Sequence, residues 1–158
     1  MRTLIAHALK ISGAALLLIA GTATLGSSWA QTAKKDFIAP VQADASSTAV
    51  KVPANQHLIF LAGHTASKPA GSTDYGSFDD QVKAAFAKID KSVQAAGGKL
   101  TDIVQLSVFL TDMRYQPQFA KIAQELFKGG YPAITYVEVS HMAEPQLLIE
   151  IQPIAVIP

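Results

Sequence analysis

The sequence predicts a two-layer α+β domain, in which a mixed six-stranded sheet carries both helices on one face. Two segments, 78–96 and 117–128, repeat apolar residues at helical spacing on one side only. Strand-like runs precede, separate and follow them, the clearest being 57–63, 102–112 and 133–139. Because neither helix is apolar on all sides, each is expected to cover one face of the sheet.

The first thirty residues have the pattern of a secretory signal peptide. Arg2 and Lys10 form a positive start, and an apolar run covers 11–25. We expect cleavage between Ala30 and Gln31, giving a periplasmic or secreted protein with no stable membrane insertion. The alternative is an uncleaved membrane anchor, but 15 apolar residues fall short of the roughly 20 that span a bilayer.

The composition argues against several classes of function. The chain has no cysteine, so it has no disulfide, thiol nucleophile or thiolate metal site. Without the signal peptide, 11 basic residues stand against 12 acidic ones, and the lysines are scattered. A nucleic-acid partner is therefore not expected, because such binders carry a basic stripe. The separation of His57, His64 and His141 predicts no metal site, with a chance assembly of His64 and His141 in space as the alternative.

A short lead-in is predicted to precede the domain. Residues 31–47 are polar and small and are expected to be flexible, with Asp36–Val41 as either a short strand or an ordered arm. The domain proper is placed at 48–158. It begins with an alternating strand at 48–52, followed by the apolar run 57–63, which we expect to be a buried strand.

A capping box marks the start of the first helix. Ser77 is a good N-cap with Asp80 three residues on, and Gly97 and Gly98 end the helix. The predicted apolar stripes are Phe78, Val82, Ala85, Ile89, Val93 and Ala96 in the first helix and Phe119, Ile122, Ala123 and Leu126 in the second. The strand between the helices is expected to turn one face inward, namely Val104, Leu106, Val108 and Leu110.

Two residues are candidates for a functional site on pattern alone. Glu150 lies in the most apolar strand, where an ionised carboxylate is costly unless it is hydrogen-bonded or beside solvent. Burial would suit it to proton transfer; the alternative is an outward-facing Glu on a strand with one wet face. Gly63 ends an apolar run before a loop. It provides either a positive φ or a backbone N–H that faces a ligand.

Taken together, these segments resemble the Rid (YjgF-like) family of reactive enamine and imine deaminases. The resemblance covers about residues 50–156 and rests on LIFLAG, FDDQVKAAFAKIDKSVQAAGGKLTDIVQLSVFLTDM, YPAITYVEV and IEIQPIA. It implies a chorismate-mutase-like fold and a homotrimer with small-molecule pockets at the subunit interfaces. It also implies hydrolysis of the substrate to a 2-keto acid and ammonia without a cofactor.

The resemblance also implies roles for particular residues. Glu150 matches the catalytic Glu that orients water, and Gly63 matches the Gly whose backbone amide positions the ligand. Ile134 stands where active members carry the Arg that grips the substrate carboxylate, and Tyr136 stands where many have Cys. An isoleucine cannot reproduce the two parallel hydrogen bonds of a guanidinium. Lys68, in the loop after Gly63, is the candidate substitute.

Three functions are compatible with this resemblance. The first is an exported deaminase whose activity on enamines and imines is altered or weak. The second is a non-catalytic trimer that binds uncharged or aromatic ligands in the same pocket, which Ile134 and Tyr136 make more apolar. The third is a holdase or protein-interaction role on an exposed apolar patch. Export would remove the chain from the cytosolic enzymes that generate the family's usual imines.

Overall fold

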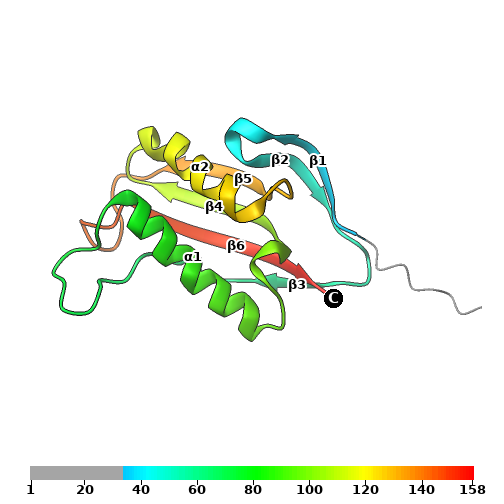
Figure 1. Cartoon of the computed structure of the whole chain (residues 1–158), viewed down its shortest axis with the longest axis horizontal. Coiled ribbons are helices and arrows are strands. Elements are labelled where there is room, and N and C mark those ends of the chain that lie inside the picture. The colour runs from blue at the N-terminus through cyan, green and yellow to red at the C-terminus, as the bar shows by residue number, and fades with distance from the viewer. Residues whose placement is uncertain (1–33) are drawn as a thin grey trace, which may run out of the picture. The chain divides into compact units, whose positions relative to one another are not determined.

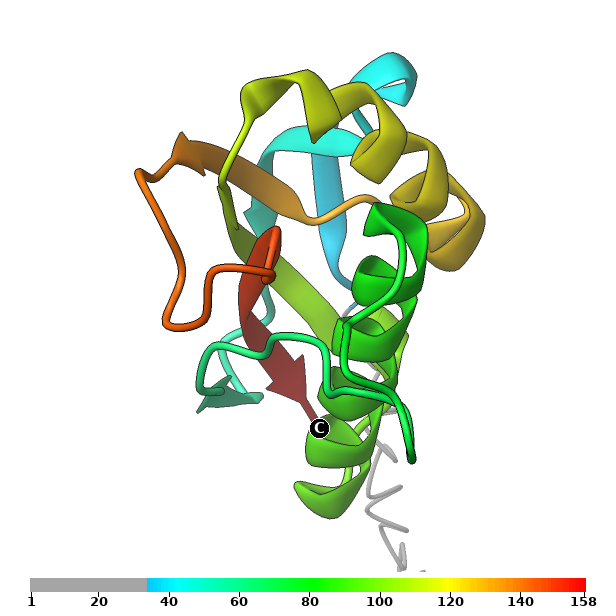
Figure 2. The same cartoon turned by 90° about the vertical axis from the view of Figure 1, so that its left-hand side faces the viewer.

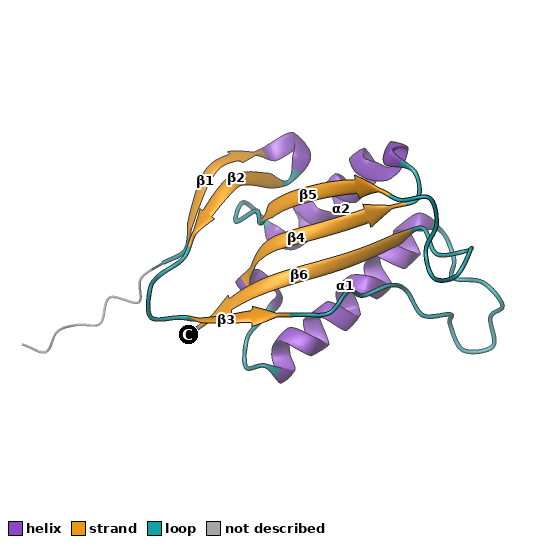
Figure 3. Cartoon of the chain, turned by 180° about the vertical axis from the view of Figure 1, so that it is seen from behind, coloured by secondary structure: helices purple, strands orange, loops and turns teal. Residues whose placement is uncertain are grey.

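The computed structural model describes residues 34–158, and the predicted signal peptide lies outside them. Both helices lie against one face of the sheet (Figure 1), and the other face is uncovered when viewed from behind (Figure 3). The predicted two-layer α+β class is confirmed. The elements are β1 Asp36–Val41, β2 Ser46–Lys51, β3 His57–Phe60, α1 Phe78–Ala95, β4 Ile103–Leu110, α2 Gln116–Phe127, β5 Ala133–Glu138 and β6 Ile149–Ile157, with short 3-10 turns at Gln42–Asp44, Leu100–Asp102 and Met113–Tyr115.

The six predicted strands are divided between two sheets. Four form a mixed sheet in the order β3-β6-β4-β5, in which β4 and β5 are parallel and the other pairs antiparallel. The hairpin β1-β2 stands beside β5, where the Ser47 N–H donates to the Pro132 carbonyl at 3.0 Å. The Ile134 N–H donates to Ser46 Oγ at 3.1 Å. A regular ladder does not form there, because Pro132 has no N–H and Ser46 accepts with its side chain.

The short strand predicted at Asp36–Val41 is confirmed as β1, but the flexibility predicted for 42–47 is wrong, because these residues complete the hairpin with β1. The Tyr131 hydroxyl donates to Gln42 Oε1 at 2.7 Å, and Ser47 Oγ donates to the Tyr131 carbonyl at 2.7 Å. Ala45, at φ 49°, turns the chain and is fully buried. The small residues of this stretch, which resemble a linker in sequence, allow the hairpin to pack closely. The predicted domain boundary at 48 therefore falls within strand β2 of the hairpin.

Figure 2 shows the helix layer and the sheet from the side, and the buried apolar side chains form the core between them. The capping box of α1 is formed: the Asp80 N–H donates to Ser77 Oγ, and the Ser77 N–H donates to Asp80 Oδ2. Burying a large apolar side chain contributes about 1.5–3 kcal/mol, so the predicted stripes hold β4 and β6 firmly in place. The largest fully buried side chains include Phe119, Ile89, Ile103, Leu106, Leu110, Ile149 and Ile151.

The prediction of a buried strand at 57–63 is wrong. β3 is shorter and lies at the edge of the sheet, with Leu58 52% and Phe60 73% exposed. Phe60 pairs with Ile154 on the uncovered face, whereas Ile59 packs against the core. An apolar run does not distinguish a strand buried on both faces from one whose second face is left bare.

No helix within residues 34–158 combines the length and the apolar character that a membrane crossing requires.

Candidate functional site

Glu150 lies on the uncovered face of the central strand β6. Its neighbours Ile149 and Ile151 point to the helices and are fully buried. Because side chains alternate along a strand, Glu150 points the other way, next to Phe109 of β4 in the register of the two strands. The sequence left open whether Glu150 was buried or outward-facing, and the structure places it, half-buried, on the face without helices.

Gly63 lies directly against the Glu150 carboxylate. A Cβ atom at Gly63 would be 1.8 Å from Glu150 Oε1, so no other residue fits without moving Glu150. The approach is fixed by His64, whose N–H and carbonyl pair with Ile151 at 2.9 and 3.0 Å. Gly63 does not have a positive φ, so close contact explains this glycine. Its N–H pairs with no acceptor among residues 34–158.

A cavity of about 340 Å³ opens beside this pair. Its size is within the range of small-molecule sites. The polar side chains that line it come from β6 and from the segment after β5, so it collects groups distant in sequence. The lining residues are Gly63, Phe109, Val139, His141, Met142, Ala143, Glu150 and Gln152.

Most of these lining residues were not identified from the sequence. Alternation along the strands assigns Phe109 and Gln152 to the same face as Glu150 only once the register is known. His141 was interpreted as a surface or loop histidine, with a metal ligand as the alternative. Segment 139–143 lies beside β6 only because of the tertiary fold. No local sequence pattern predicts this contact.

The loop 139–148 forms one side of the cavity and is tied to the loop 64–77. Lys68 Nζ lies 3.3 Å from Glu144 Oε2 and 5.0 Å from the centre of the Tyr75 ring. A hydrogen bond from Tyr75, followed by that from Lys68, lowers the pKa of the Glu144 carboxyl. Lys68 is thus paired with Glu144 and does not line the cavity, and its role as a substitute for the family's Arg stays a prediction.

Gln81, on the first turns of α1, holds the loop 139–148. Its side chain is 1% exposed. Nε2 donates to the Gln146 carbonyl at 3.0 Å and to the Gly76 carbonyl at 3.3 Å, and Oε1 accepts from the Leu148 N–H at 2.9 Å. A buried amide with three satisfied bonds is a strong constraint. The loop therefore has a defined position beside the cavity.

Ile134 and Tyr136 lie on the opposite face of the sheet from Glu150. They stand beside Leu106 and Val108 of β4 and pack against the core. The Tyr136 ring is 5.7 Å from the Phe119 ring, edge to face. Burial, followed by the charge of Asp44, raises the pKa of the Tyr136 phenol. The four predicted site residues thus form two pairs, and one subunit does not bring the pairs together.

The histidines do not assemble into a metal site. The His64 ring faces α1, where Nε2 is 3.3 Å from Ser92 Oγ, whereas His141 lines the cavity on the other face. Burial and then the positive charge of Lys88 lower the pKa of His64, against the opposing effect of Glu150. Within residues 34–158 no three His, Asp or Glu side chains are grouped as metal ligands.

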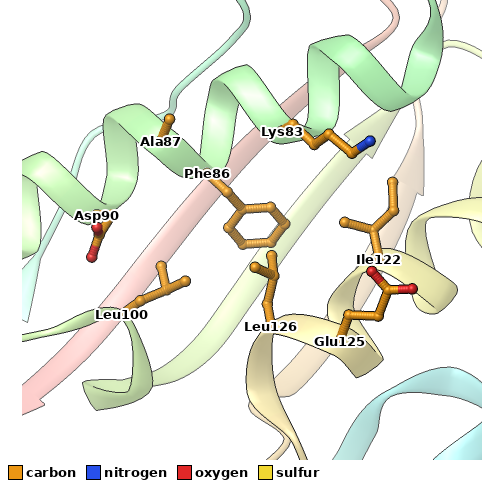
Figure 4. A pocket seen from close by; sticks show the side chains of 8 residues that line it. All are labelled: Lys83, Phe86, Ala87, Asp90, Leu100, Ile122, Glu125 and Leu126. Carbon is orange, nitrogen blue, oxygen red and sulfur yellow. The ribbon is translucent and has the colours of Figure 1, made fainter.

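A second cavity, of about 310 Å³, lies between α1 and α2 on the helix side (Figure 4). Its floor is apolar, and three charged side chains stand around its rim. It pairs no carboxylate with a histidine, so it does not offer the proton-transfer groups found beside Gly63. Its lining is Lys83, Phe86, Ala87, Asp90, Leu100, Ile122, Glu125 and Leu126.

The fold and the site define a two-layer α+β protein with a carboxylate and a glycine facing a cavity on the bare side of its sheet. A family model described as Endoribonuclease L-PSP matches residues 38–157, and the chain belongs to this family, the Rid or YjgF family. The resemblance read from the sequence is thereby confirmed.

Individual proteins agree with this assignment. A RutC family protein of Pyrococcus horikoshii is 32% identical over 100 residues, which are 63% of this chain and 79% of that protein. A 2-iminobutanoate/2-iminopropanoate deaminase of Dermatophagoides farinae is 28% identical over 82 residues, 52% of this chain and 63% of that protein. A Rid-family crystal structure from Yersinia pestis has a TM-score of 0.67 at 21% identity, covering 78% of this chain and 98% of the other.

Proposed function

We propose that this chain is an exported hydrolase of reactive enamine or imine intermediates, with activity that is altered or weakened by Ile134. The observation that carries the proposal is the Glu150 carboxylate held against Gly63 at the wall of a cavity. It occurs in a member of a family in which a relative bears the name of an imine deaminase.

The two residues suit this hydrolysis. Water adds to the carbon of a protonated imine, and Glu150 orients the water and accepts its proton. The resulting carbinolamine expels ammonia and leaves a carbonyl group. The N–H of Gly63 is available to donate to the polar end of the ligand. No cofactor is required for these steps.

The substrate class follows from Ile134. Losing the Arg partner of a desolvated carboxylate costs about 2–5 kcal/mol. At about 1.4 kcal/mol for each factor of ten, capture of a 2-imino acid is roughly thirty- to several-thousand-fold weaker. The preferred substrates are therefore imines without a carboxylate, and 2-imino acids are poor ones.

A homotrimer with intersubunit pockets is part of the proposal. Gly63 and Glu150 lie on one face of the subunit, and Ile134 and Tyr136 on the other, so a pocket made from all four needs two copies. Leu58, Phe60 and Val137 are exposed apolar side chains, and a bare apolar face of this kind is typical of an interface. They supply the contact surface.

Export completes the proposal and rests on the apolar segment at 11–25. The full chain is expressed in a bacterial host and recovered from the cell fractions. A periplasmic form whose mass corresponds to a start at Gln31 is the expected result. An uncleaved chain in the membrane fraction would contradict export by a cleaved signal.

The activity test compares the wild type with Glu150→Gln and Ile134→Arg. Imines are generated in the assay by oxidases acting on amines or amino acids, and surviving imine is trapped with semicarbazide. We expect the wild type to speed the decay of uncharged imines and Glu150→Gln to abolish the effect. Ile134→Arg is expected to gain activity on 2-imino acids.

The second candidate function is a non-catalytic binding protein. The packing of Ile134 and Tyr136 against the core favours it, because no polar group replaces the Arg there. A silent wild type together with an active Ile134→Arg would establish this alternative. Holdase action would depend on neither Glu150 nor Ile134.

A further inference from the structure

His141 and Glu150 are the only titratable side chains among the residues that line the cavity beside Gly63. They come from different segments: Glu150 from the central strand β6, and His141 from the loop between β5 and β6. The other lining residues are glycine, alanine, apolar side chains and the amide of Gln152. The cavity therefore brings together one carboxylate, one imidazole and one amide side chain.

The loop fixes His141 in this position. The next residue, Met142, is 8% exposed and packs in a small cluster with Ala66, Tyr75 and Leu147. Further along, the loop is tied down by the buried Gln81. The Ser140 hydroxyl lies 3.0 Å from His141 Nδ1, which leaves Nε2 free to meet a ligand. His141 is itself exposed, and the anchoring of its neighbours is what keeps it at the cavity wall.

The hydrolysis includes more than one proton transfer, so a second proton carrier would assist it. Hydrolysis of a protonated imine removes a proton from water in the addition step and delivers one to nitrogen before ammonia departs. A single carboxyl group can take these protons in turn only if it reaches the water, the nitrogen and the hydroxyl one after another, whereas a second group beside the nitrogen divides the transfers between two positions. An imidazole gains and loses a proton readily near neutral pH.

We propose that His141 is the second proton-transfer group of this site, acting with Glu150; the inference rests on the proposed function. Glu150 takes a proton from water as the C–O bond forms, giving a neutral carbinolamine. The imidazolium of His141 donates to the amine nitrogen, the C–N bond breaks, and ammonia leaves. His141 regains its proton from the carbinolamine hydroxyl as the carbonyl forms. Ammonia takes the proton from Glu150 and departs as ammonium.

The charged surroundings of His141 are defined. Glu150 faces the cavity from β6, and Glu144 in the same loop is engaged by Lys68 and Tyr75. Glu138, at the end of β5, accepts a hydrogen bond from the Met113 N–H at 2.7 Å. Because Glu144 and Glu138 are already engaged, Glu150 is the carboxylate left to work with His141.

The experiment uses His141→Gln, His141→Ala and Glu150→Gln in the full chain, with uncharged imines as substrates. His57→Ala is the matched control, since His57 lies on the edge strand and does not line the cavity. We expect kcat/KM to fall about 100-fold in both His141 variants, mainly through kcat, with unchanged thermal midpoints.

Added imidazole distinguishes a role of His141 in proton transfer from a structural role, because a purely structural loss would not be restored by imidazole. It should restore activity to His141→Ala, but not to Glu150→Gln or to a reaction without enzyme. An active His141→Gln beside an inactive Glu150→Gln would overturn the role of His141 and leave the proposed function standing. Full activity in Glu150→Gln, or a wild type silent on every imine, would overturn the proposed function and this inference with it.

Discussion

The contact between Gly63 and Glu150 makes a quantitative prediction for the substitution Gly63→Ala. The added Cβ would lie 1.8 Å from Glu150 Oε1, whereas real Cβ atoms essentially never approach another atom within 3.0 Å. The difference shows that the carboxylate oxygen must move by at least 1.2 Å. The backbone does not need to move, because the obstructing atom is the end of a flexible side chain.

The substitution should therefore separate activity from stability. A misplacement of about 1 Å at a reacting group costs on the order of 100-fold in rate, which is about 2.7 kcal/mol in the barrier. Turning Glu150 aside costs about 0.5–1.5 kcal/mol if it leaves its rotamer. Alanine offsets about 0.4–1 kcal/mol of this through the unfolded state. We expect a free energy of unfolding within about 1 kcal/mol of the wild type.

The assay is a double-mutant cycle on imine decay, with urea unfolding of each variant. If Gly63 acts by positioning Glu150, adding Gly63→Ala to Glu150→Gln should change the residual rate little. An equal loss in both backgrounds would refute this reasoning and indicate a direct role of the Gly63 backbone. Unchanged activity in Gly63→Ala alone would show that the carboxylate position does not matter.

Three further predictions concern stability and assembly. Because the lowered pKa of His64 favours the neutral ring in the folded state, stability should be lost as pH falls below about 6.5. Urea midpoints at pH 7.5 and 5.5 should show a smaller loss in His64→Gln, and an equal loss would contradict this. Gln81→Leu should cost at least about 2 kcal/mol in urea unfolding, because its three partners lose their hydrogen bonds; a neutral result would mean that water replaces them. Phe60→Asp should reduce the sedimenting mass to that of a monomer, with Ile38→Asp on the hairpin as the control, and an unchanged mass would place the interface elsewhere.

The elements predicted well are those governed by local rules. The start of α1 at Ser77, the stop at Gly97 and the buried stripes depend on residues within a few positions of one another. β3 and the hairpin depend on distant partners. Leu58 is exposed because no element covers the second face of the sheet, and Ser47 is ordered by a carbonyl 84 residues away. Composition alone does not contain that information.

The candidate site shows the same division. Glu150 was singled out because a carboxylate is unusual in an apolar strand; the structure places it against Gly63, and its catalytic role stays a prediction. The functional roles of Ile134 and Tyr136 stay predictions, since they lie on the other face. His141 was overlooked because it sits in an irregular loop, and its place beside Glu150 depends on how that loop folds back.

The central position of β6 has a consequence for when the domain can fold. β6 follows every other strand along the chain, yet both β3 and β4 pair with it. In a nascent chain without β6, β3 has no strand to pair with, and β4 is paired with β5 on one edge only. The sheet is completed only by pairing across about the whole domain, which is slow compared with local folding. A chain made in this order completes its four-stranded sheet only after its last strand has been synthesised.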